Sequence, residues 1–160
     1  MSNMTNPLEG LLGLQAGIES GLQMAECPGD NGLSVVFDQP EGVIRMTYAM
    51  IEDRMVIGYT VFVKDQPIGS VTVFDIGYAV REEYRGKGLA TRIVNSSIDL
   101  LTDTMGLGGH FDSYYIEAIV GVGNLPSNKL ARKIISDSPK QIVDEHSGED
   151  AYQYLRLVRL

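Results

Sequence analysis

The residues with the clearest chemical potential are two glycines and two basic residues at the start of an amphipathic stretch. Residues 85–88 read Arg-Gly-Lys-Gly and follow an apolar run that ends at Val80. A glycine turn between a strand and a helix leaves the first helical N–H groups unpaired, at the positive end of the helix dipole. Glycine has no Cβ that would keep an anion away from this backbone. The pattern indicates phosphate binding, although a glycine turn that merely starts a helix would look the same.

Two common phosphate motifs fit this stretch poorly. A Walker A loop needs Ser or Thr after its Lys, but Lys87 is followed by Gly88. A dinucleotide-binding loop needs a further glycine where Thr91 stands, within a βαβ unit that opens near the start of the chain.

The wider pattern Arg85-x-x-Gly88-x-Ala90 resembles the pyrophosphate loop of the GNAT (Gcn5-related) N-acetyltransferases, which has the form Arg/Gln-x-x-Gly-x-Gly/Ala. Residues 76–91, IGYAVREEYRGKGLAT, are most similar to the ribosomal-protein and small-molecule branch of that superfamily. The resemblance implies that acetyl-CoA is the cosubstrate and that this loop holds its pyrophosphate. The residues that inherit this role are Arg85, Gly86, Lys87, Gly88, Leu89, Ala90 and Thr91.

A second match to the family follows about 40 residues later, in the expected order. Asn124-x-x-Ser127, with Leu130 three places on, resembles the Asn-x-x-Ser-x-x-Leu element of many of these enzymes. Any capped helix could produce this element alone, since Asn is a favoured N-cap. Together with the loop it extends the resemblance over roughly residues 43–158, and it implies that Asn124 contacts the pantetheine arm or the strand junction.

The resemblance also implies that the pantetheine arm docks like an extra strand on the backbone of Tyr78, Ala79 and Val80. We expect a bulge at Asp75 and Gly77, because both interrupt a long β-rich run, and a bulge would leave those backbone groups unpaired.

Acetyl transfer to an amine needs a proton acceptor, donors to the carbonyl oxygen and a proton donor for the departing thiolate. Asp75 and Glu117 are the candidate bases, although each could be an ordinary polar-face carboxylate or could act through water. Backbone N–H groups of the strand that contains Ala79 could hold the carbonyl oxygen. Much of the family protonates the thiolate with a Tyr seven places after the Asn, where this chain has Ala131. Ser127 is the natural substitute, with helix capping as the alternative role of its hydroxyl.

The remaining composition excludes several other functions. The net charge of −8 and pI near 4.7 argue against nucleic-acid binding and suit cationic acceptors. His110 and His146 lack Cys or carboxylate partners at ligand spacing, so no metal is expected. No nucleophile–His–acid arrangement is visible, which favours direct transfer. Cys27 is alone and no apolar run is long enough to span a membrane, so we expect a cytoplasmic protein.

The elements that position these residues form one domain of 160 residues. We expect an N-terminal helical segment at about 8–24, a cofactor-binding core at about 43–138 and a C-terminal hairpin at about 141–159. Glycines should break the first helix, because each costs about 1 kcal/mol relative to Ala. Turns at 52–54 and 64–67 should form antiparallel hairpins. Helices are expected at 89–105 and from Asn124 to Pro139, and strands at 33–37, 43–51, 55–63, 68–80, 114–122, 141–144 and 152–158.

The expected fold is therefore α/β: a mixed, mostly antiparallel sheet with helices on both faces and a splayed parallel strand pair. The expected function is transfer of an acetyl group from acetyl-CoA to a primary amine of a small molecule or peptide. Two alternatives stay open: a regulatory module that binds acyl-CoA without chemistry, and a scaffold that binds no coenzyme A. A homodimer through a sheet edge or the last hairpin is compatible with the sequence.

Overall fold

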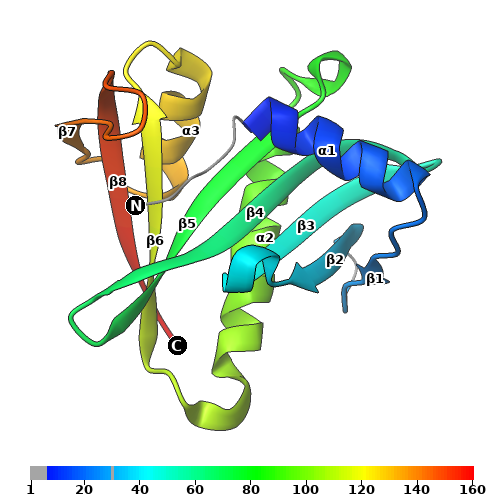
Figure 1. Cartoon of the computed structure of the whole chain (residues 1–160), viewed down its shortest axis with the longest axis horizontal. Coiled ribbons are helices and arrows are strands. Elements are labelled where there is room, and N and C mark those ends of the chain that lie inside the picture. Colours follow the sequence, from blue (N-terminus) through cyan, green and yellow to red (C-terminus); the bar gives the residue numbers. More distant parts are fainter. Residues whose placement is uncertain (1–6, 30) are drawn as a thin grey trace.

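The structure, a computed structural model, describes residues 7–29 and 31–160. Eight strands form one sheet in the order β1-β2-β3-β4-β5-β6-β8-β7 (Figure 1). In the described part of the chain, β5 and β6 are the only parallel neighbours. The α/β fold predicted from the sequence is confirmed. The strands are β1 (Ala25–Glu26), β2 (Leu33–Asp38), β3 (Arg45–Glu52), β4 (Met55–Ile68), β5 (Val71–Val80), β6 (Ser113–Gly121), β7 (Lys140–Val143) and β8 (Asp150–Arg159).

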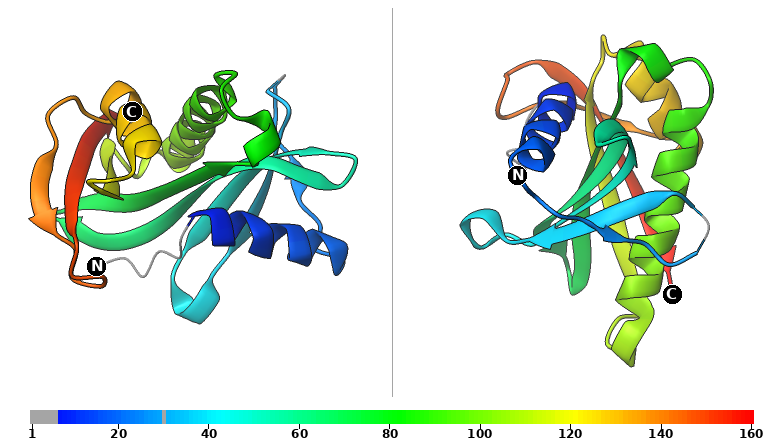
Figure 2. Two further views of the ribbon diagram at one scale, coloured as in Figure 1. Left: turned by 90° about the horizontal axis from the view of Figure 1, so that it is seen from above. Right: turned by 90° about the vertical axis from the view of Figure 1, so that its right-hand side faces the viewer.

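Helices cover both faces of the sheet (Figure 2). The first, α1 (Pro7–Glu19), lies on one face over β4 and β5, whereas α2 (Leu89–Gly106) and α3 (Leu125–Ile134) lie on the other. Three short 3-10 turns complete the chain: η1 (Pro40–Gly42), η2 (Glu82–Tyr84) and η3 (Leu107–Gly109). No helix in residues 7–29 or 31–160 is long and apolar enough to cross a membrane.

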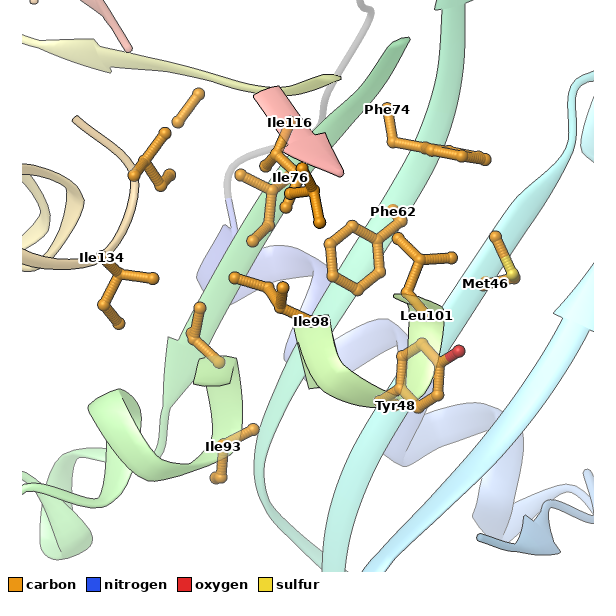
Figure 3. Close-up of a cluster of buried hydrophobic side chains, with 14 of the residues drawn as sticks. Met46, Tyr48, Phe62, Phe74, Ile76, Ile93, Ile98, Leu101, Ile116 and Ile134 are labelled. Carbon is orange, nitrogen blue, oxygen red and sulfur yellow. The ribbon is translucent and has the colours of Figure 1, made fainter. Parts of the chain in front are cut away.

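The main core lies between the sheet and α2, and it is drawn in Figure 3. Ile93, Ile98 and Leu101 recur on one face of α2, which is the face that the apolar spacing of the sequence predicts. The helix approaches β4 closely at Gly58, where a Cβ would lie 2.8 Å from Ile93. Strand residues that complete this core include Met46, Tyr48, Phe62, Phe74, Ile76 and Ile116.

A second, smaller core lies under α1. Leu11 and Ile18 are buried there against Val56 and Tyr59 of β4. The predicted break in this helix is wrong, because Pro7–Glu19 forms one continuous helix. Packing against the sheet offsets the propensity cost of the internal glycines. Leu12, by contrast, is 53% exposed.

Gln15, which interrupts the leucine pattern of α1, fixes the helix to the sheet. Its Oε1 accepts hydrogen bonds from the backbone N–H of Val56 at 2.7 Å and from Arg81 Nη2 at 3.2 Å. Its Nε2 donates to the carbonyl of Arg54 at 3.0 Å. The amide is thus a half-buried polar bridge, in which donor and acceptor are both satisfied.

The strand connections differ in part from those predicted. The first hairpin turns at Asp53 and Arg54, as expected, and both have positive φ. The second turn lies at 69–70 rather than 64–67, since β4 continues to Ile68. The predicted bulge at positions 75–77 is also wrong. Pairing of β4 with β5 is regular there, and its irregularity lies between Asp65 and Ile68.

Candidate active site

The N-terminus of α2 is an open group of backbone donors. Gly86 and Gly88 have φ of 78° and 74°, which is the left-handed region that glycine adopts without penalty. Gly88 caps the helix, and no side chain of the described residues caps its first turn. A Cβ at either glycine would meet nothing within 4 Å, so the space above the loop is open. The first turn of α2 carries no acidic residue that would repel an anion.

Basic side chains surround this helix end. Arg85 and Lys87 are exposed in the loop, and Arg92 is exposed one turn into α2. Arg85 also stabilises the loop, because its Nε donates to the carbonyl of Val80 at 3.0 Å. Unpaired N–H groups, a helix dipole and nearby cations form a site that fits a diphosphate.

Next to this loop, the two parallel strands separate. Pairing of β5 with β6 spans Val73↔Tyr115, Phe74↔Ile116 and Asp75↔Glu117, and it ends there. Residues 78–80 of β5 therefore pair with β4 alone, which leaves their other edge open toward β6. The unpaired edge that the sequence suggests thus exists, although strand separation rather than a bulge produces it. Figure 1 shows β5 and β6 diverging toward the end of the sheet where α3 lies.

A cluster of three carboxylates lies where the strands part. Side-chain oxygens of Asp65, Asp75 and Glu117 all lie within 4.8 Å of one another. Asp75 is 2% exposed, and neither of its carboxyl oxygens has a hydrogen-bond partner among the described residues. Glu117 Oε2 accepts a hydrogen bond from Gln153 Nε2 at 2.7 Å. Burial, reinforced by the two neighbouring carboxylates, raises the pKa of Asp75 to about 9.

An open hollow of about 1070 Å³ leads to this cluster from the face that carries α1. Glu9 and Leu14 of α1 form one side, and η1 forms another. The sheet forms its floor, which includes Val61 and ends at Asp65 and Asp75. The hollow also contains the ion pair of Asp38 with Arg45, in which Arg45 Nε donates to Asp38 Oδ1 at 2.9 Å. Its carboxylates favour cationic ligands.

The second sequence element lies across the opening from β5. Asn124 caps α3 and accepts a hydrogen bond from the N–H of Ser127 at 3.3 Å. Asn128, one turn into the helix, donates to the carbonyls of Gly121 and Asn124, both at 2.9 Å. The predicted capping role of Asn124 is confirmed. These bonds fix the start of α3 against the end of β6.

Tyr78 crosses from β5 to this helix. Its phenol donates a hydrogen bond to the backbone carbonyl of Ser127 at 3.0 Å. Burial raises the pKa of Tyr78, and the nearby Tyr154 acts in the same direction. Position 131, where much of the resembled family has a tyrosine, holds an alanine that is 0% exposed within the core.

The predicted site residues thus occupy two connected regions. The loop at 85–91 and the edge at 78–80 lie on the open side of β5, with Asn124 and Ser127 across from them. Asp75 and Glu117 lie side by side where the opening ends, and they project toward the face of α1.

Sequence reasoning missed two features of the site: the position of Asp65 and the hydrogen bond of Tyr78 to α3. The composition of residues 64–67 predicts a turn, but Asp65 lies on β4 two residues after Val63. Strict alternation along the strand indicates that both residues face the same side. The hydrogen bond from Tyr78 to α3 joins residues 49 positions apart, so no local pattern could reveal it.

Comparison with known proteins gives a consistent result. The family profile described as "Acetyltransferase (GNAT) domain" matches residues 33–134, which is more than half of the chain. Comparison with curated protein sequences gave no significant match.

Solved structures with a similar fold include a complex bound to CoA and two acetyltransferases. The NatC complex bound to Gag peptide and CoA has a TM-score of 0.54 and 22% identity over 70% of each chain. The ribosomal-protein-S5-alanine acetyltransferase from Vibrio fischeri has a TM-score of 0.53 and 18% identity, over 72% of this chain and 61% of that one. A chimera of the spermidine N-acetyltransferase SpeG from Vibrio cholerae and hSSAT has a TM-score of 0.52 and 15% identity, over 71% of this chain and 69% of that one. The chain thus spans less than two thirds of the Vibrio fischeri enzyme.

Proposed function

Because this chain belongs to the GNAT acetyltransferase family, we propose that it transfers an acetyl group directly from acetyl-CoA to a primary amine. The acceptor is an amine of a small molecule or a peptide. One observation carries the proposal: the open edge of β5 and the hollow under α1 meet at the pair Asp75 and Glu117. Donor and acceptor can therefore approach one point from opposite faces of the sheet.

The donor side would hold coenzyme A through the backbone. The N–H groups of Leu89, Ala90 and Thr91 lie in the first turn of α2 and suit the diphosphate. The exposed cations Arg85 and Lys87 add attraction that weakens with salt. The free edge of residues 78–80 suits the amide groups of the pantetheine arm, in the manner of an added strand.

The acceptor side would receive a cation. Asp65 at the end of the hollow and Glu9 of α1 favour an ammonium group over an anion or a neutral alcohol. Two of the similar structures are consistent with this chemistry, since one is of a complex bound to a peptide and one is of a spermidine N-acetyltransferase chimera.

The carboxylate cluster supplies a proton acceptor of suitable strength. A primary ammonium has a pKa of about 10, so it must lose a proton before it attacks the thioester. Three carboxyl groups this close cannot all be ionised, and Asp75, with a pKa of about 9, is the member that holds a proton. In its ionised form it is basic enough to take the proton of the acceptor. Asp75 with Glu117 is therefore the proposed base, and transfer needs no acyl-enzyme.

The test is to incubate the protein with acetyl-CoA and a panel of amines while the release of free thiol is followed. The panel contains a diamine, a polyamine and short peptides with free or blocked N-termini. Thiol release that requires both a free amine and the protein supports the proposal. Release with blocked peptides alone, or none above background with any amine, contradicts it.

A second function, acyl-CoA binding without chemistry, is favoured by one observation: Ala131 is buried where a proton donor is common in the family. It predicts retention of acetyl-CoA by the protein and no thiol release in the same panel. We also propose a cytoplasmic location. The single cysteine, which allows no intrachain disulfide, agrees with this location.

A further inference from the structure

Acyl transfer from a thioester requires a proton donor at the departing sulfur, and the chain lacks a tyrosine at position 131. The hydroxyl of Ser127, in the Asn124-x-x-Ser127 element at the start of α3, is the donor that the sequence suggests. The backbone N–H of Ser127 donates to Asn124, and its backbone carbonyl accepts from Tyr78. The second contact brings a phenol to the start of α3 from the opposite side of the opening.

We propose that the Tyr78 phenol, and not the Ser127 hydroxyl, protonates the thiolate that leaves the acyl donor. This inference rests on the proposed acetyl transfer and assigns one further catalytic group to it. Tyr78 thereby supplies from β5 the group that Ala131 cannot supply from α3.

The placement of Tyr78 carries the argument. Its backbone lies on the free edge of β5, three positions beyond Asp75, the last residue paired with β6. Its side chain spans to the carbonyl of Ser127, 3.0 Å from the phenol oxygen. The phenol thus lies between the proposed pantetheine edge and the N-terminus of α3, where a departing anion is also stabilised by the helix dipole.

The chemistry of a phenol suits the step. The ordinary pKa of a phenol, about 10, and that of a thiol, about 8.5, both lie above neutral pH, so the phenol and the released thiol are both protonated when the step is complete. Burial raises the pKa of Tyr78, which keeps the donor protonated at neutral pH. The titratable neighbour that acts on it is Tyr154, whose own phenol donates to Asn128 Oδ1 at 2.7 Å.

The step balances as follows. The amine nitrogen forms a bond to the thioester carbon, and the carbon–sulfur bond breaks with its electron pair on sulfur. The O–H of Tyr78 turns from the carbonyl of Ser127 to the sulfur, which takes its proton, and solvent restores that proton to the phenolate. The acceptor nitrogen loses two protons from its ammonium form, one to the carboxylates and one to solvent, so one proton is released overall.

The experiment measures the pKa of the thiol of bound coenzyme A, through the ultraviolet absorbance of the thiolate. The complex with desulfo-coenzyme A is subtracted, which removes the absorbance of ionising tyrosines. The variants are Tyr78→Phe and Ser127→Ala, with Tyr152→Phe as a control outside the opening. Thermal unfolding reports the structural effect of each change separately.

We expect Tyr78→Phe to raise the pKa of the bound thiol by about 1 unit, because a hydrogen bond to the thiolate is lost. It should also lower kcat by about 10²-fold. Ser127→Ala and Tyr152→Phe should leave the thiol pKa at the wild-type value.

Three results would overturn the assignment. The first is a thiol pKa that Tyr78→Phe leaves unchanged while coenzyme A still binds. The second is a shift produced by Ser127→Ala instead, which would identify Ser127 as the donor. In both cases the proposed acetyl transfer survives. A wild-type protein that binds no coenzyme A contradicts the acetyl transfer itself, and with it the role of Tyr78.

Discussion

Asp75 and Glu117 are opposite one another in the last pair that joins the two parallel strands. Beyond them β5 and β6 separate, and the hollow under α1 reaches Asp75 from the other face of the sheet. One carboxylate pair therefore marks both the end of the opening between β5 and β6 and the end of the hollow under α1. In the proposed function, this is the point where the acceptor ammonium loses its proton.

Asp75→Asn should lower kcat by about 10²-fold or more, because it removes the most basic carboxylate of the cluster. Glu117→Gln should have a smaller effect, since the second carboxylate remains. The measurement is thiol release at saturating acetyl-CoA with the best amine of the panel. Asp103→Asn, an exposed change on α2, is the matched control and should retain full activity. Equal rates for Asp75→Asn and Asp103→Asn would remove Asp75 from the mechanism.

The same substitution should change how stability depends on pH. Because the pKa of Asp75 is raised to about 9 in the folded state, the folded protein retains a proton that the unfolded chain releases above its ordinary value near 4. Wild-type stability is therefore lost as the pH rises from about 4 to 9. We expect Asp75→Asn to melt at a higher temperature than wild type at pH 8, and the difference to shrink toward pH 4. A difference that is constant with pH would mean that Asp75 titrates normally.

Two glycines of α1 should respond to the same substitution with opposite signs. A Cβ at Gly10 collides with the hydroxyl of Tyr59, which donates to the carbonyl of Pro7 at 2.8 Å, whereas a Cβ at Gly13 meets nothing within 4 Å. We expect Gly10→Ala to lower the melting temperature. Gly13→Ala should raise it, since Ala is favoured over Gly in a helix by about 1 kcal/mol. Two shifts of the same sign would contradict the docking of α1 described above.

The cap of α3 gives a further test. Asn124→Ala removes the acceptor for the N–H of Ser127, and such losses cost about 1 kcal/mol, or about 2–4 °C in a chain of this size. Asn124→Asp retains the acceptor and should melt near the wild-type temperature. Thermal unfolding measures both, and an equal loss in the two variants would indicate that the amide nitrogen of Asn124 is the important group.

Local patterns in the sequence predicted most of the fold. The loop at 85–91, the buried face of α2 and the cap at Asn124 each depend on residues within one or two turns, so periodicity and capping rules apply to them. The turn between β4 and β5 lies later in the chain than composition predicts. Residues 65–67 have the composition of a turn, but in the structure they extend β4.

Other features could not be predicted in the same way. They depend on contacts between residues far apart in the chain, such as Gln15 with Val56 and Tyr78 with Ser127. The separation of β5 from β6 is also a property of the sheet as a whole. Asp75 and Gly77 suggest an irregularity within β5. The pairing of β5 with β4 is regular there, however, and it is the pairing with β6 that ends at Asp75.

The central claim is that the backbone at the start of α2 binds the diphosphate of coenzyme A, and calorimetry of acetyl-CoA binding tests it most directly. The decisive variant is Gly88→Glu, and Gly109→Glu is its control at the other end of the helix. Both glycines have positive φ, of 74° and 66°, and open space for a Cβ, so backbone strain and added charge are matched. We predict that Gly88→Glu abolishes binding while Gly109→Glu binds as wild type does. Equal affinity in the two variants would contradict the claim.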